Sequence, residues 1–393
     1  MNPAMKSLDS KLIHAGEPRP RVAGAVSLPV FQSSTFEYGG ESSYHDVRYI
    51  RLNNTPNHKA LNDKLRQLEN ADAAMVTASG MAAISTALLT VLESGGHLLV
   101  QECLYGGTHS FVTEDLGRYG LSYDFIDGGR PDTWAAKLKP ETRAIYVETM
   151  TNPLMQVADL DAAVRFAREH NLISMVDNTF ASPVNFRPAE RGFDLSLHSA
   201  SKYLNGHSDI VAGVAIGRGD LIERFTHRLN HLGGTLDPHA CFLLHRGLKT
   251  LALRVRQQNR SAQALAAALA EHPRVRQVNH PGLKTHPDHD RATELLDGFG
   301  GMLSFELDGG VDLAERFLQS VTIPLVAPSL GGIETLVTRP ATTSHAGVKP
   351  EDRAELGISD ALVRVSVGIE DSDELVADFT VSLDQLGPLH PAA

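Results

Sequence analysis

The spacing of hydrophobic positions separates a patternless beginning from a long stretch of alternating helix and strand signals. Residues 1–57 have no sustained periodicity, whereas Leu61, Leu65 and Leu68 recur on one helical face. A short apolar run at 73–77 is followed by a mostly apolar stretch at 81–92, which is too long for a strand. We therefore predict an irregular N-terminal arm, then a strand, a tight turn and a buried helix.

The same alternation continues to about residue 250. Strands separated by helical crossovers can pair in parallel, so the pattern predicts an α/β fold with a mostly parallel sheet buried on both faces. The further strands are expected at 97–102, 143–148, 172–177 and 195–198, with helices at about 108–119 and 160–170.

The pattern changes near residue 250, where a long helical signal begins. It is followed by strand signals at 302–307 and 362–367 and a helix signal at 313–318. The sequence thus predicts three parts: the arm (1–57), an α/β domain (58–250) and a smaller C-terminal domain (251–393).

Composition narrows the class of protein. The chain has 36 Lys and Arg against 47 Asp and Glu, a net charge of −11, which argues against a nucleic-acid partner. Its two cysteines, Cys103 and Cys241, allow no disulfide framework and no thiolate zinc site, as expected in a reducing compartment. No apolar stretch is long enough to span a membrane, and residues 1–10 lack a signal-peptide core, so we expect a cytoplasmic location without membrane contact.

Several common chemistries have no motif in this chain. G-x-x-x-x-G-K-[ST], G-x-S-x-G and H-E-x-x-H are all absent from the sequence. His280, His286 and His289 lie in a Pro-rich polar loop, which favours surface histidines over metal ligands. We therefore expect no metal.

Lys202 is the first candidate for chemistry. It follows an apolar strand in the stretch 194–209, and the carboxyl ends of strands in open α/β sheets are where ligands bind. A lone lysine there is usually a surface charge, but one partly removed from water has a lowered pKa and can form a Schiff base. If this segment is extended, Ser199 and Ser201 lie on one side of it, where both could donate to a phosphate.

Two further features suit the same chemistry. Asp177 ends a second apolar strand, where it is either an ordinary cap or a carboxylate that keeps a pyridinium nitrogen protonated. Ser79-Gly80-Met81 opens the predicted buried helix, so its amide groups and the positive end of the helix dipole are available to an anion. Together with Lys202 these residues indicate a phosphate cradle, a pyridinium partner and a Schiff-base lysine.

These residues resemble the fold-type I pyridoxal phosphate enzymes of cysteine and methionine metabolism (transsulfuration): cystathionine γ-synthase, the cystathionine β- and γ-lyases, methionine γ-lyase and the O-acylhomoserine sulfhydrylases. The resemblance runs from about Tyr49 to Glu370. It implies an aspartate aminotransferase-like fold with a smaller C-terminal α+β domain. The motifs that carry it are Ser201-Lys202-Tyr203-Leu204-Asn205-Gly206-His207, Ser79-Gly80-Met81, Leu104-Tyr105-Gly106, Glu148-Thr149 with Asn152-Pro153, Asp177-Asn178-Thr179, Ser329-Leu330-Gly331-Gly332 and Arg364-Val365-Ser366-Val367-Gly368.

The resemblance also implies roles for single residues. Lys202 would carry the pyridoxal 5'-phosphate and move protons, Asp177 would pair with the ring nitrogen, and Tyr105 would stack on the ring and assist proton transfer. Arg364 with Ser329 would grip the substrate carboxylate, a task that suits the arginine fork. The other implied cofactor contacts are Gly80, Met81, Ser199 and Ser201 to the phosphate, Asn152 near the ring hydroxyl and the substrate, and Tyr49 and Arg51 to the phosphate of a neighbouring subunit.

The implied activity is γ-elimination from cystathionine, methionine or a related homoserine-derived amino acid, by a homo-oligomer that is commonly a tetramer built of two dimers. A γ-replacement enzyme stays an alternative, and a cystathionine β-lyase is less favoured because Asn152-Pro153 resembles the γ-acting branch. Gly107 stands where methionine γ-lyases tend to have a cysteine nearby, and Pro328 where several cystathionine-handling members carry glutamate. An aminotransferase and a non-catalytic cofactor-binding protein are the remaining alternatives.

Overall fold

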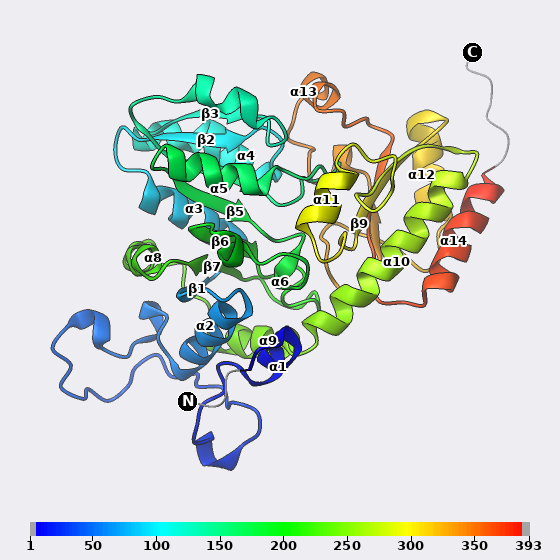
Figure 1. The fold of residues 1–393 in the computed structure, drawn as a ribbon. Helices are drawn as coiled ribbons and strands as arrows, with labels where there is room; N and C mark the ends of the chain where they lie inside the picture. The colour runs from blue at the N-terminus through cyan, green and yellow to red at the C-terminus, as the bar shows by residue number, and fades with distance from the viewer. Residues whose placement is uncertain (1–4, 387–393) are drawn as a thin grey trace. The chain divides into compact units, whose positions relative to one another are not determined.

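The chain forms two compact units in the computed structural model, which describes residues 5–386 (Figure 1). The chain passes between the units more than once. The first unit comprises Met1–Glu102, Ser110–Thr149 and Asp159–Ala252, and the second comprises Cys103–His109, Met150–Ala158 and Leu253–Ala393.

The first unit is built on a seven-stranded sheet with the order β1-β7-β6-β5-β4-β2-β3. Strand β7 runs antiparallel to its neighbours β1 and β6, and the other neighbouring pairs are parallel. The strands are β1 (Ala73–Thr77), β2 (His97–Gln101), β3 (Ser122–Ile126), β4 (Thr142–Glu148), β5 (Ile173–Asp177), β6 (Leu195–Ser199) and β7 (Gly213–Gly217).

Helices cover this sheet. Every residue of β2 and β7 is buried, which requires cover on both faces of the sheet. Helix α5 packs against β4 and β5, α3 against β6 and β7, and α8 against β1 and β7. The α-helices of this unit are α1 (Leu8–His14), α2 (Pro56–Leu68), α3 (Gly80–Val91), α5 (Leu160–Glu169), α6 (Ser182–Asn185), α7 (Pro188–Arg191), α8 (Gly219–Leu232) and α9 (Pro238–Leu248).

The mostly parallel sheet is confirmed, and the strands and crossover helices predicted for it end within one residue of the observed bounds, apart from one helix. The helix expected at 108–119 is instead α4 (Gly106–Ser110), a π-helical turn (Phe111–Asp115) and a 3-10 turn (Leu116–Tyr119). The hydrophobic pattern does not reveal strands β3 and β7. Polar residues break the apolar run of β3, and glycines at both ends hide β7.

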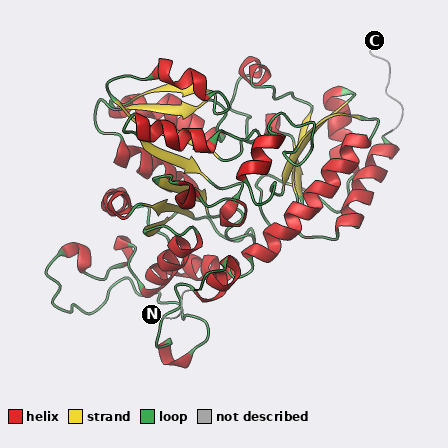
Figure 2. Ribbon diagram, viewed as in Figure 1, coloured by secondary structure: helices red, strands yellow, loops and turns green. Residues whose placement is uncertain are grey.

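The N-terminal arm is not wholly irregular, since it contains α1. This helix has a Ser7 N-cap and a single buried residue, Leu12, so it is too short to give a periodic signal. The Lys64 side chain of α2 donates to the Leu12 carbonyl at 2.8 Å, and buried Glu17 pairs with Lys249 at 2.7 Å. The rest of the arm is mostly loop (Figure 2), yet its first part is tied to α2 and α9.

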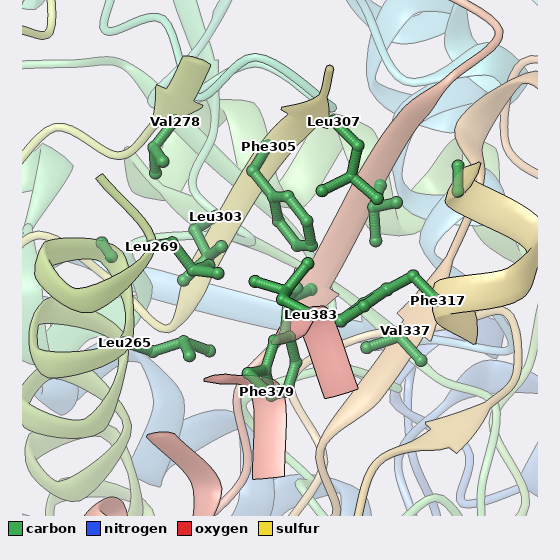
Figure 3. Close-up of a cluster of buried hydrophobic side chains, with 14 of the residues drawn as sticks. Leu265, Leu269, Val278, Leu303, Phe305, Leu307, Phe317, Val337, Phe379 and Leu383 are labelled. Carbon is green, nitrogen blue, oxygen red and sulfur yellow. The ribbon is translucent and has the colours of Figure 1, made fainter. Parts of the chain in front are cut away.

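The second unit contains a five-stranded sheet with the order β10-β11-β12-β9-β8, which is antiparallel except for the β10–β11 pair. One face packs on α10, α12 and α14 through buried side chains such as Phe305, Phe317 and Phe379 (Figure 3). The elements are α10 (Leu251–Glu271), β8 (Val275–Asn279), α11 (His289–Leu295), β9 (Met302–Leu307), α12 (Gly310–Ser320), β10 (Leu325–Val326), β11 (Leu336–Thr338), α13 (Pro350–Glu355), β12 (Leu362–Ser366) and α14 (Ser372–Gln385).

Within residues 5–386, no helix is both long enough and apolar enough to cross a membrane.

Candidate functional site

An anion cradle lies where β1 leads into α3. The Ser79 side chain caps the helix by accepting from the Ala82 amide at 3.0 Å, and the Ser79 carbonyl accepts from the Ala83 amide. The first two amides of α3, those of Gly80 and Met81, are thereby left without an acceptor within residues 5–386, as is usual at a helix N-terminus. A negatively charged group would be stabilised there by both amides and by the helix dipole.

The first residue of α3, Gly80, lies in close contact with the end of β6. A Cβ added to Gly80 would lie only 2.8 Å from the Ser199 Cβ, so no larger residue fits at this position. A Cβ added to Gly213, the first residue of β7, would lie 2.1 Å from the Ser79 carbonyl oxygen. The two glycines therefore allow the turn before α3, the end of β6 and the start of β7 to meet.

Lys202 lies in the turn that follows β6, half-buried. The Lys202 amide donates to the Ser199 carbonyl at 3.1 Å, and the Lys202 carbonyl accepts from the Gly206 amide at 2.8 Å, so the backbone of this lysine is fixed. Ser201 belongs to the same turn and does not extend the strand, which corrects the expectation that it faces the same side as Ser199. Its hydroxyl accepts from the Ala212 amide and donates to the Ala212 carbonyl at 3.2 Å, so a phosphate would have to replace that acceptor.

Asp177 is the last residue of β5 and is buried. One carboxylate oxygen accepts from the Thr179 amide at 2.9 Å, and the other accepts from the Tyr146 hydroxyl at 3.4 Å. Burial raises the pKa of the Asp177 carboxyl, opposed by hydrogen bonds from Thr179 and by the charge of His198. A positively charged group beside this carboxylate would offset the unfavourable burial of its charge.

Two buried contacts connect Asp177 with its surroundings. The Thr179 hydroxyl, which bonds to Asp177, also accepts from the Ser199 amide at 2.8 Å and so joins the ends of β5 and β6. The buried Glu69 carboxylate accepts from the His198 ring nitrogen Nε2 at 2.7 Å. It also accepts from the side-chain amide of Asn178 at 3.4 Å. These hydrogen bonds connect the end of α2 with β5 and β6 next to Asp177.

Tyr49 and Arg51 lie in the arm of the same unit. The Arg51 guanidinium donates to the Asn230 carbonyl at 2.8 Å and to the Tyr44 hydroxyl at 2.5 Å, and it stands 5.8 Å from the centre of the Tyr49 ring. Arg51 is half-buried, so it is held by its own chain and is not a freely solvated surface charge.

The second unit contains the remaining candidates, and Arg364 of β12 hydrogen-bonds to two of them. The buried Arg364 donates to the Asn152 side-chain oxygen at 3.1 Å and to the Ser329 carbonyl at 2.9 Å. Ser329 has a φ of +96°, a strained value for a serine, and strain of this kind is often kept at binding sites. The Asn152 side-chain oxygen is thus engaged by Arg364.

Arg364 belongs to a polar row across the second sheet. It pairs in register with Ser304 of β9 and Thr338 of β11, so these three side chains share one face. The Ser304 hydroxyl donates to the Pro153 carbonyl at 2.8 Å. The neighbouring β12 residues, Val363 and Val365, point the other way, into the apolar core. The sheet thus separates a structural face from one that carries the candidate binding residues.

Tyr105 also belongs to the second unit and is 45% exposed, so its ring is accessible. The Gly106 that follows it leaves no room for a side chain, since a Cβ there would lie 2.7 Å from the Ser344 carbonyl oxygen. The backbone after Tyr105 therefore lies in close contact with the backbone of Ser344.

The expectation of surface histidines in the Pro-rich loop is wrong for two of the three. His280 and His286 are buried, and burial lowers the pKa of His280 to about 4. His289 stacks on Phe299. A loop rich in proline and histidine reads as polar, but here its rings pack into the second unit. Within residues 5–386, no group of three or more His, Cys, Asp or Glu side chains is arranged to hold a metal ion.

The candidates therefore form two groups, one in each unit. Lys202, Asp177 and the cradle residues lie at neighbouring ends of β1, β5 and β6 in the first unit, while Tyr105, Asn152, Ser329 and Arg364 lie in the second. Sequence reasoning missed Ser304, which holds the Asn152 loop through the Pro153 carbonyl, because no motif marks it. Thr179 was part of a quoted motif, but only the fold reveals its contact with the end of β6.

Pyridoxal phosphate fits the first unit by the chemistry of its residues. The cradle that excludes a Cβ suits a phosphate, the buried carboxylate suits a cationic ring nitrogen, and a lysine at the same edge of the sheet suits an aldehyde. The fold and these residues define a pyridoxal phosphate enzyme of fold type I.

Comparison with known proteins identifies the family. The model described as "Cys/Met metabolism PLP-dependent enzyme" matches residues 9–384. The chain is 38% identical to a cystathionine β-lyase of Bacillus subtilis (strain 168) over 98% of both chains, and 38% identical to a cystathionine γ-lyase of the same organism over 95% of this chain and 98% of that protein. The crystal structure of a cystathionine γ-synthase from Xanthomonas oryzae pv. oryzae, in complex with aminoacrylate and cysteine, superposes with a TM-score of 0.93 at 36% identity, covering 98% of this chain and 99% of that one. The protein belongs to the Cys/Met metabolism PLP-dependent enzyme family, whose cofactor is pyridoxal phosphate.

Proposed function

We propose that this enzyme is a C–S lyase that acts by γ-elimination on cystathionine, methionine or a related homoserine-derived amino acid. The observation that carries this proposal is the Asn152-Pro153 pair, which resembles the γ-acting branch of the family and whose Asn152 side chain accepts a hydrogen bond from Arg364. The relatives at 38% identity include both a β-lyase and a γ-lyase, so identity alone does not favour either reaction.

The residues of the first unit take the roles that bind and activate. The amides of Gly80 and Met81, with the hydroxyls of Ser199 and Ser201, bind the phosphate group. The Asp177 carboxylate would accept a hydrogen bond from the ring nitrogen and so keep that nitrogen protonated. When bound, pyridoxal phosphate supplies an electron sink for the negative charge that develops at the substrate Cα. The Lys202 amine would hold the cofactor aldehyde and, when free of it, would remove the proton from the substrate Cα.

The residues of the second unit hold the substrate and assist departure of the leaving group. Arg364, with Ser329 and the Asn152 amide, binds the substrate carboxylate in a bidentate, charge-assisted contact. For elimination at Cγ a second proton leaves Cβ, and Tyr105 or Lys202 protonates the departing sulfur.

The second candidate function is γ-replacement, as in a cystathionine γ-synthase or an O-acylhomoserine sulfhydrylase. It is favoured by the structural likeness to the γ-synthase. Elimination and replacement use the same residues until the leaving group departs, and they then differ in whether water or a thiol completes the reaction.

A panel of substrates tests the proposal. The enzyme would be incubated with cystathionine, methionine, homocysteine and O-acylhomoserines, each with and without a thiol. Formation of 2-oxobutanoate from a sulfur amino acid supports γ-elimination. Pyruvate would mean β-elimination, and a new thioether formed faster than any oxoacid would establish replacement, and either result would overturn the proposal.

Arg364 is expected to recognise the substrate carboxylate. Removing a charged group from this buried hydrogen-bonded contact in Arg364→Ala should weaken substrate binding by about 2 to 5 kcal/mol. The measurement is the substrate KM together with the dissociation constant of a non-reactive amino acid. If Arg364→Ala binds the amino acid within twofold of the parent, another cation recognises the substrate carboxylate. The matched control is Arg316→Ala, which changes an exposed arginine of α12.

We propose further that active sites are shared within a homo-oligomer, Tyr49 and Arg51 reaching the phosphate of a neighbouring subunit. Arg51→Ala and Lys202→Ala proteins are each expected to be nearly inactive. If Arg51 acts across a two-fold interface, a mixed dimer has one site with both native residues. Random pairing makes half of the dimers mixed, so about one quarter of the sites should recover after co-expression. Mixed oligomers as inactive as either parent would mean that Arg51 serves its own subunit, through contacts like those with Asn230 and Tyr44.

A further inference from the structure

Two buried serines lie near Arg364 on the polar face of the second sheet, and the proposed reaction gives neither hydroxyl a role. Ser304 of β9 pairs in register with Arg364, and Ser366 follows two residues later on β12, so the three side chains share one face. The serines are 0% and 1% exposed. Strand neighbours such as Leu303 and Phe305 point the other way, into the apolar core (Figure 3).

Ser304 holds the segment that carries Asn152. Its hydroxyl donates to the Pro153 carbonyl at 2.8 Å and accepts from the Asn279 side-chain amide of β8 at 3.0 Å. The Asn279 side-chain oxygen in turn accepts from Gln277 at 2.9 Å, which fixes the amide with its NH₂ group toward Ser304. Because an NH₂ group can only donate and a carbonyl can only accept, the Ser304 proton is directed at Pro153.

Ser366 holds the segment that carries Ser329. Its hydroxyl oxygen accepts from the Gly331 amide at 2.8 Å. The next residue, Gly332, is held as well, because its carbonyl accepts from the Gln258 side chain of α10 at 2.7 Å. The φ of +96° at Ser329 is unfavourable for a serine and persists only where the surrounding structure fixes the backbone. The contact with Ser366 is one of those that fix it.

These two segments supply the acceptors that orient Arg364. One terminal guanidinium nitrogen donates to the Asn152 side-chain oxygen at 3.1 Å, and the other donates to the Ser329 carbonyl at 2.9 Å. A guanidinium is planar and rigid, so one acceptor on each terminal nitrogen sets its direction. Ser304 bonds to the residue that follows Asn152, and Ser366 bonds to the second residue after Ser329. Each serine therefore fixes the place of one acceptor.

We propose that Ser304 and Ser366 are positioning residues for substrate recognition, which keep the Arg364 guanidinium aligned with the substrate carboxylate by holding its two acceptors. This inference rests on the proposed role of Arg364 and extends the site to two hydroxyls that act through other residues. Alignment matters because a bidentate contact needs two parallel N–H···O bonds. Hydroxyls suit the task, since they add no charge beside the arginine and can donate to a carbonyl or accept from an amide.

The test separates carboxylate recognition from general binding. L-alanine and ethylamine, which is alanine without its carboxylate, would each be titrated into the holoenzyme and followed by the change in cofactor absorbance. The dissociation constant of ethylamine divided by that of L-alanine measures the preference for the carboxylate. The variants are Ser304→Ala, Ser366→Ala and Arg364→Ala. The matched control is Ser261→Ala, which changes a buried serine of α10 whose hydroxyl bonds with that of Ser372.

Each of the two serine variants is expected to lower this preference about fivefold, the effect of one neutral hydrogen bond, while ethylamine binding stays within twofold. The substrate KM should rise more than kcat falls, and Ser261→Ala should keep the parent preference. A preference within twofold of the parent in both Ser304→Ala and Ser366→Ala, or equal weakening of both ligands, would overturn the proposal. A preference kept in only one of them would remove that serine from the role.

Arg364→Ala distinguishes this inference from the proposed function. If Arg364→Ala keeps the preference, the proposed role of Arg364 has failed; if it removes the preference and both serine variants keep it, only this inference has failed. Ser304→Cys and Ser366→Cys keep the test decisive if the alanine variants do not fold, because a thiol nearly fills the space of the hydroxyl but is a weak donor and acceptor. The preference should fall in these variants too, and folded cysteine variants with the parent preference would count against the positioning role.

Discussion

A Lys202→Ala protein is expected to lose the visible absorbance of the lysine-bound cofactor and nearly all of its turnover. The lysine follows β6 in a turn whose backbone is fixed by hydrogen bonds to Ser199 and Gly206. No other residue of that turn is a lysine, so no neighbour can replace its amine. A positioned group that transfers a proton contributes about 10²- to 10⁴-fold to a rate, and loss of the covalent attachment adds to this.

The measurement is an absorbance spectrum of the purified protein, together with turnover of the best substrate from the panel. Lys137→Ala is the control, since Lys137 is an exposed lysine of the same unit and its loss should change neither property. A Lys202→Ala protein with the parent spectrum would place the Schiff base on another lysine.

Asp177→Asn is expected to slow exchange of the substrate Cα proton by orders of magnitude and to weaken cofactor retention, because an unprotonated pyridine is a poorer electron sink. Asparagine keeps the size of the side chain and an oxygen for the Thr179 amide, so the loss would follow from the charge.

The same substitution should stabilise the cofactor-free protein. Burial raises the pKa of Asp177, so the folded state binds its proton more tightly than the unfolded chain does. Stability from this carboxyl is therefore full below its unfolded pKa of about 4 and is lost as the pH rises through the folded value. The Asp177→Asn protein, whose amide does not titrate, would not show that loss. Thermal melting of both apoproteins should favour the variant at pH 7 and give equal stability near pH 3, and a variant less stable at pH 7 would reduce Asp177 to a structural cap.

The sheet of the first unit was predictable because its strands are apolar and its crossovers amphipathic. Buried parallel strands leave a continuous apolar run, and β2 and β4 have one. β3 did not, since this edge strand carries Asp124, which pairs with Lys139. Helix α1 was hidden for a different reason: its stability depends on contacts with α2, and a helix of seven residues has little periodicity of its own.

The candidate site was predictable where chemistry is local. Lys202, Asp177 and Gly80 stand at the ends of elements that the sequence marks, so their place at one edge of the sheet follows from strand pairing. The contacts of Ser201 with Ala212 depend on a turn whose geometry no spacing rule predicts. Ser304 acts through the Pro153 carbonyl, more than 150 residues away, and such a pairing exists only in the folded chain.

The path of the chain through the second unit has a consequence for attempts to dissect the enzyme. A fragment that began at Leu253 would contain the whole five-stranded sheet and its apolar core, and so could be taken for an autonomous module by length alone. It would lack Met150–Ala158, however, and would leave the buried hydroxyl of Ser304 and one arm of the Arg364 fork without the acceptors they have in the intact chain. Cutting the gene at the boundary would therefore yield a fragment with an intact core and an unsatisfied polar face, prone to self-association, and the Cys103–His109 and Met150–Ala158 segments would have to be supplied for it to resemble its native form.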